Sequence, residues 1–235
     1  MATALKSVGW LAMFFFACVL FYTTAEYLSL RTDINFLLVK DEEISNVLWM
    51  GSFYVHITSA MVVLVVGPIQ FIKNLRNKNI RLHRTLGKIY VWGVLFFAAP
   101  SGLIMAFYAE GGFWSTIGFG LMSLLWFFAT FMAVKMAIAK KITEHQKWMY
   151  RSYALTFAAV TLRLLIPWFS TFIYNDQFIT VSTAWLSWII NLMVVEVIIF
   201  LTLRKEFLSM SDRRGRMRTV DSRVDPNTQP KNETR

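Results

Sequence analysis

The chain has 235 residues, of which 56% are hydrophobic and 16% charged, and its 24 Lys and Arg against 14 Asp and Glu give a formal net charge of +10. This composition is too apolar for a disordered chain, a collagen-like fibre or a nucleic-acid-binding domain. The single cysteine, Cys18, excludes an internal disulfide and a Cys-based metal site. A multi-pass membrane protein remains, with the lipid bilayer as its surroundings and no nucleic acid as a partner.

Six runs of the sequence are long and apolar enough to cross a bilayer as helices, which takes about 20 residues. In chain order they are predicted at 8–28, 47–72, 87–108, 116–138, 148–169 and 183–203. Barrel strands would be shorter and would alternate between apolar and polar residues. We therefore predict an all-α bundle of six transmembrane helices over residues 1–210. The first run exceeds the apolar core of a secretory signal, so we interpret it as an uncleaved anchor helix.

The basic residues predict the orientation. Of the 24 Lys and Arg, 21 lie at Lys6, in segments 73–88 and 135–151, or from Arg204 onward, all on one side of a six-span bundle. Cytoplasmic segments carry such an excess, so both termini are expected in the cytoplasm. Arg31 and Lys40 lie on the opposite side, and Arg163 lies inside a span.

Residues 211–235 form a polar tail that contains two prolines. The tail holds too few apolar groups to offset the entropy of ordering, so we predict a disordered cytoplasmic segment. Its basic cluster at 213–218 could contact anionic lipid headgroups, or it could serve only as an orientation signal.

Three polar residues lie within predicted spans. Arg163 follows Arg151 by 12 residues, which places it about 18 Å along the helix. It either locks the bundle through carbonyls or one acid, or binds an anionic group in a midplane cavity. Glu196 in the sixth span is its candidate charge partner or a protonated acid. His56 in the second span is either a neutral structural histidine or a ligand-binding group beside Arg163.

The second span ends in the sequence Gly67-Pro68-Ile69-Gln70. Pro68 removes a helical hydrogen bond from the carbonyl one turn earlier, and a freed carbonyl in a membrane needs another partner. Pro100 has the same effect in the third span. Gln70 adds an amide at the cytoplasmic boundary.

Two histidines lie in the predicted cytoplasmic loops, His83 after the second span and His145 after the fourth. Their basic and phenolic neighbours are Arg84, Tyr90, Arg151 and Tyr153. One hypothesis is a site for a lipid headgroup or phosphate. The other is one haem b ligated by His83 and His145. No motif for nucleotide binding, zinc hydrolysis or a nucleophilic serine is present, so no catalytic or metal-ligating residue is predicted and a non-enzymatic protein is favoured.

The sequences GPIQF at 67–71 and LHRTLGKIY at 82–90 resemble the first motif block of a bacterial membrane family, domain of unknown function 2306. The segments 145–149 and 151–164 resemble a second, longer block. The resemblance implies a multi-pass protein of the bacterial inner membrane without a defined activity. It directs attention to His56, Gln70, His83, Arg84, Tyr90, His145, Arg151, Tyr153 and Arg163. Lys88 replaces a frequent Arg, which removes the bidentate fork that favours phosphate.

Three functional hypotheses follow for this chain. The first is a protein that binds or conveys an anionic or amphiphilic small molecule or lipid. The second is a membrane redox protein with one haem b. The third is a non-catalytic assembly partner of a membrane complex.

Overall fold

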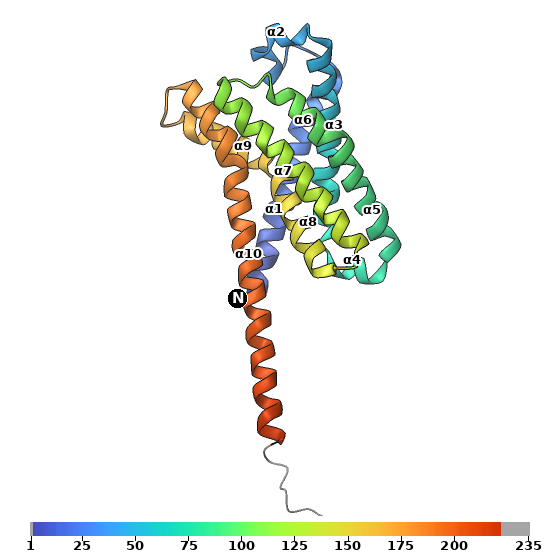
Figure 1. The fold of residues 1–235 in the computed structure, drawn as a ribbon. Coiled ribbons are helices and arrows are strands. Elements are labelled where there is room, and N and C mark those ends of the chain that lie inside the picture. The colour runs from blue at the N-terminus through green and yellow to red at the C-terminus, as the bar shows by residue number, and fades with distance from the viewer. Residues whose placement is uncertain (1, 222–235) are drawn as a thin grey trace, which may run out of the picture. The chain divides into compact units, whose positions relative to one another are not determined.

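The computed structural model describes residues 2–221, with side chains at 9, 11–38, 40, 42–72 and 75–204 (Figure 1). Over the part described, 86% of the chain is helical and no strand occurs. The predicted all-α fold is therefore confirmed. The chain divides into two units, the first covering 1–195 and the second beginning at Glu196.

Six helices are long and apolar enough to cross a membrane. The first two spans lie in α1 (Ala2–Ala25) and α3 (Val47–Gln70). The third joins α5 (Ile80–Trp92), a π-helical segment η3 (Gly93–Ala98) and α6 (Ala99–Ala106). The others are α7 (Phe113–Ile138), the pair α8 (Ile142–Thr156) and α9 (Ala158–Ser170), and the first part of α10 (Asp176–Asp221). The predicted number of spans is confirmed.

Short helices mark the two ends of the bundle. The end that we call the α2 end holds η1 (Glu26–Ser29), η2 (Asn35–Val39), α2 (Asp41–Ile44) and the connection 107–112. The opposite α4 end holds α4 (Lys73–Lys78) and the turn 139–141. These connections are short, so successive spans run antiparallel.

The main core lies where α3, α5, η3, α7 and α8 meet. Small residues at the centre of this core, Ala98, Ala129 and Ala133, let the helices approach closely. Tyr90 and Tyr153 fill the remaining space and are buried. Because lipid tails are as apolar as these side chains, close packing and hydrogen bonds between helices hold the bundle together.

Gly67 and Pro68 in α3 explain the position of Tyr153. Pro68 has no N–H for the carbonyl of Leu64, and the Tyr153 hydroxyl donates a hydrogen bond to that oxygen at 3.1 Å. The ring of Tyr153 lies against Gly67, where any side chain would overlap it. The freed carbonyl predicted from Pro68 thus has a partner from a distant helix.

A second irregularity positions His56. The third span changes from π-helix to α-helix next to Pro100. At this junction the Ser101 hydroxyl donates to the carbonyl of Phe97, and His56 Nδ1 donates to the carbonyl of Ala98 at 2.8 Å. Carbonyls that the irregular helix exposes are therefore bonded to side chains, one of which comes from α3.

The second unit consists of the continuation of α10 from Glu196 to Asp221. The first part of the segment predicted to be a tail, 211–221, is therefore helical here. Elongating an existing helix costs little compared with nucleating one, which favours such an extension. Residues 222–235 of that predicted tail lie outside the described residues.

Candidate functional site

A cavity of about 530 Å³ lies inside the first unit, between α1, α3, α6, α7, α9 and the start of α10. Ligand pockets in proteins commonly enclose about 300–1,000 Å³. Most of its wall is apolar, with Leu20, Phe53, Ile57, Met61, Phe119 and Ile166 among the lining residues. The apolar wall would suit the hydrocarbon part of a ligand, and the few polar groups would then determine how the ligand lies.

Helix α9 provides one wall of the cavity. The chain leaves α8 through a turn at Phe157 and then continues as α9, which packs against α8 and α1. Two lining residues of α9, Arg163 and Ile166, are exposed. Because these two side chains are exposed, the cavity is accessible where α9 lines it.

Arg163 is the principal cationic group in the wall. It lies on α9 within a membrane-spanning segment and lines the cavity. Within the part of the chain that the structure describes, its guanidinium makes neither a hydrogen bond nor an ion pair. Five N–H donors are therefore available for a ligand.

His56 faces the same cavity from α3. Its Nδ1 must carry a proton, because the carbonyl of Ala98 can only accept. In the neutral imidazole, Nε2 is then an acceptor without a proton. His56 and Arg163 lie close enough to interact electrostatically. The predicted proximity of these two residues agrees with this arrangement.

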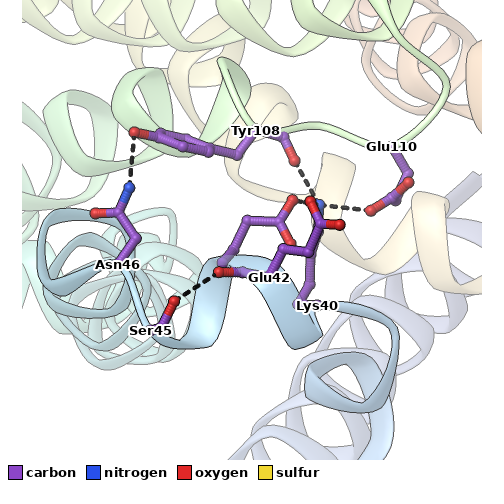
Figure 2. Close-up of polar contacts among 7 residues, drawn as sticks. Lys40, Glu42, Ser45, Asn46, Tyr108 and Glu110 are labelled. Carbon is purple, nitrogen blue, oxygen red and sulfur yellow. Dashed lines mark hydrogen bonds and ion pairs between the residues drawn. The ribbon is translucent and has the colours of Figure 1, made fainter.

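A buried lysine, Lys40, lines the cavity at the α2 end. Figure 2 shows its polar contacts. Lys40 Nζ forms ion pairs with Glu110 at 2.6 Å and Glu43 at 2.9 Å, and it donates to the carbonyl of Tyr108. Asn46 donates to the hydroxyl of Tyr108 at 3.2 Å. These bonds tie the connection 107–112 to the segment around α2. The positive charge of Lys40 is thus matched by two carboxylates.

Two of the hydroxyl groups in the lining differ in how they are bonded. Ser187 on α10 is 1% exposed, and its Oγ has no hydrogen-bond partner within the described residues. Thr156 belongs to a bonded network, in which Tyr90 and Trp126 contact its hydroxyl at 2.8 and 3.1 Å. A satisfied network therefore forms the inner wall, while Ser187 keeps a free hydroxyl at the cavity.

The histidines of the two basic loops come together at the α4 end. His83 and His145 lie close enough to interact electrostatically, and Arg84 is near His83. Gln70 is assigned with its amide nitrogen towards His83, and it donates to Nδ1 at 2.8 Å and to the carbonyl of His83 at 3.0 Å. The sequence hypothesis thus grouped residues that are neighbours.

The two histidines differ in the hydrogen bond at Nδ1. His145 donates Nδ1–H to the carbonyl of Ala133 at 2.8 Å, which leaves a lone pair on Nε2 as iron ligation requires. His83 instead accepts at Nδ1, so the neutral ring carries its proton on Nε2. The haem b hypothesis stays a prediction to which this geometry adds no support. The described residues contain no group of three metal-ligating side chains.

The remaining candidates lie apart from the cavity wall. Tyr90 and Tyr153 are core residues, and the Tyr90 hydroxyl bonds Ser152 at 2.9 Å. The Arg151 guanidinium lies 4.7 Å from the ring centre of Trp148. Glu196 is the first residue of the second unit, where it is exposed. A headgroup site at the α4 end would thus lack both tyrosine hydroxyls.

Two polar residues of the cavity, Lys40 and Ser187, were not singled out from the sequence. Lys40 was counted only as one of two bases opposite the basic loops, although Glu43 three residues later indicates a local ion pair. Ser187 gave no signal, because a single serine in a transmembrane helix usually bonds to its own backbone.

Comparison with known proteins identifies a family whose description names no activity. A family model described as a predicted membrane protein, DUF2306, matches residues 53–199. No curated protein and no solved structure matches the chain.

Proposed function

The chain belongs to the DUF2306 family of predicted membrane proteins, and we propose that this member binds an anionic small molecule with an apolar body. The ligand occupies the cavity between α3, α6, α7 and α9, and its charged group pairs with Arg163. The protein acts by binding or conveying this molecule rather than by a chemical reaction.

One observation carries the proposal: Arg163 lines an apolar cavity within a span and has no hydrogen-bond or ion-pair partner among the described residues. An arginine at the centre of a membrane helix costs roughly 2.5–3.5 kcal/mol on insertion scales. A structural arginine would recover this cost through bonds to the protein. A bound anion would offset the insertion cost of Arg163. The planar set of N–H donors on its guanidinium suits a carboxylate or phosphate.

The basic residues support an inner-membrane location with both termini in the cytoplasm. The α4 end would then face the cytoplasm, and the cavity would lie in the outer half of the membrane. We expect a cytoplasm-dependent reporter such as a fluorescent protein, fused after Arg235, to be active. A periplasm-dependent phosphatase at the same position should be inactive, and the opposite pattern would overturn this orientation.

Arg163→Gln tests the proposal directly. Native mass spectrometry of the full chain, purified in a non-ionic detergent, should show an anionic adduct on the wild type. The adduct should fall at least tenfold in Arg163→Gln, because the neutral amide cannot form the ion pair. The unfolding temperature of this variant should not fall, since no bond among the described residues is lost.

Lys135→Gln is the matched control, because it removes one exposed positive charge from α7 outside the cavity. The adduct should remain in this variant. An adduct of equal abundance in Arg163→Gln and wild type, or no adduct in either, would overturn the proposal.

A further inference from the structure

Resting on this proposed function, we infer that the ligand is a single-chain carboxylic acid, bound as a monoanion. Three features of the cavity support this class: its charge balance, its hydrogen-bonding groups and its volume.

The charged side chains around the cavity can pair with one negative charge of a ligand. Lys40 is already matched by Glu43 and Glu110, so its cluster carries one excess negative charge. Arg163 is the cation without an ion pair among the described residues of the wall. A monoanion would pair with Arg163 alone. A dianionic phosphate monoester would place a second negative charge in a cavity that Glu110 already lines.

The hydrogen-bonding groups limit the number of anionic oxygens that the site can pair. The guanidinium of Arg163 offers two parallel N–H groups, which can pair with two oxygens of a carboxylate or of a phosphate. In the neutral ring of His56, Nε2 is an acceptor, because the ring proton is on Nδ1, which donates to the carbonyl of Ala98. It therefore repels a further anionic oxygen. Ser187 supplies a buried hydroxyl that has no partner among the described residues.

The other groups facing His56 do not supply another positive charge. From α6 its ring is approached by Gly102, and Ser123 of α7 lies next to the same site. Tyr27 and Tyr108 line the cavity from the α2 end and are uncharged phenols at neutral pH. Arg163 of α9 and the matched Lys40 are the cations of the described wall. A ligand with two negative charges would thus have one unmatched.

The volume favours one apolar chain. At about 530 Å³ the cavity lies within the range of about 300–1,000 Å³ that encloses a drug-sized ligand. A molecule with one alkyl chain is of that size, whereas a phospholipid with two chains and a headgroup is larger. Exposed Ile166 and Phe36 in the wall give an apolar chain access from the bilayer.

Fluorescence quenching of the full chain in maltoside micelles tests the class. Trp49 and Trp126 line the cavity, so a dibrominated 18-carbon carboxylate should quench a saturable part of the emission. The affinity for the probe, measured from this saturable quenching, should fall at least tenfold in Arg163→Gln and stay unchanged in Lys135→Gln. The competitors are an alkyl carboxylate, its methyl ester, the alkyl phosphate of equal length and a two-chain phosphatidylglycerol. They are compared at pH 8, where the phosphate is a dianion.

The carboxylate should displace the probe at least tenfold more effectively than each of the other three. If the phosphate or the two-chain lipid binds more tightly and depends on Arg163, the carboxylate inference is overturned while anion binding stands. If the methyl ester competes equally, the ligand is not recognised by charge, and both proposals fall. They also fall if no quenching depends on Arg163.

Discussion

Replacing Lys40 with methionine is expected to lower the free energy of unfolding by about 3 kcal/mol. Methionine keeps much of the length of the side chain but leaves the carboxylates of Glu43 and Glu110 without their shared cation. The side chain of Lys40 is 2% exposed, whereas that of Glu110 is 52% exposed. Breaking a buried ion pair costs about 3–5 kcal/mol. We expect the lower end of this range, because Glu110 can regain water.

Arg31→Met is the matched control in the same connection. Arg31 pairs with Asp33 at 2.7 Å, but their side chains are 63% and 66% exposed. Arg31 donates two hydrogen bonds to the carboxylate of Asp33, and these lower the pKa of Asp33. An exposed pair contributes about 0–1 kcal/mol. Unfolding in maltoside micelles by SDS titration, followed by circular dichroism, measures both variants. Equal losses would show that Lys40 does not anchor the α2 end.

Gly67→Ala should destabilise the bundle by about 2 kcal/mol, because a small-to-large change in a packed core costs about 1–3 kcal/mol. A β-carbon at Gly67 would overlap Cε2 of Tyr153 and lie 3.2 Å from Tyr90. The ring of Tyr153 cannot move freely, since it is buried and its hydroxyl bonds to Leu64. The helices α3 and α8 must therefore separate.

Gly51→Ala provides the control in the same helix, where a β-carbon would meet nothing within 4 Å. This variant should be neutral or gain up to about 1 kcal/mol from helix propensity. The double variant Gly67→Ala/Tyr153→Leu should lose less than the sum of its single changes, because the smaller side chain relieves the overlap. Additive losses in the same SDS titration would contradict the packing explanation.

Hydropathy predicted the number of spans correctly, but three of their starts were late. The third, fifth and sixth spans were predicted from residues 87, 148 and 183, whereas the helices begin at Ile80, Ile142 and Asp176. The first turns of these helices carry polar or charged residues, which fall outside an apolar run. Helix formation there depends on local backbone bonds, including a cap from Asn79, rather than on hydrophobicity.

The cost of placing polar groups in a membrane singled out Arg163 and His56, whereas Tyr90 and Tyr153 were grouped with the histidines of the basic loops. The sequence did not reveal their roles. Arg163 and His56 share one cavity, whereas Tyr90 and Tyr153 belong to the core. Tyr153 resembled a loop phenol in the sequence because the carbonyl that needs it lies on α3, 89 residues earlier in the chain.

Composition alone established a basic, multi-pass helical membrane protein, because a bilayer requires long apolar helices and penalises a charge within them. Only the tertiary structure determined which polar groups face the cavity and which are bonded in the core. That division depends on contacts between distant helices, such as Gly67 with Tyr153 and His56 with Ala98. No pattern along one helix records such contacts, because each requires two helices to approach at a particular register.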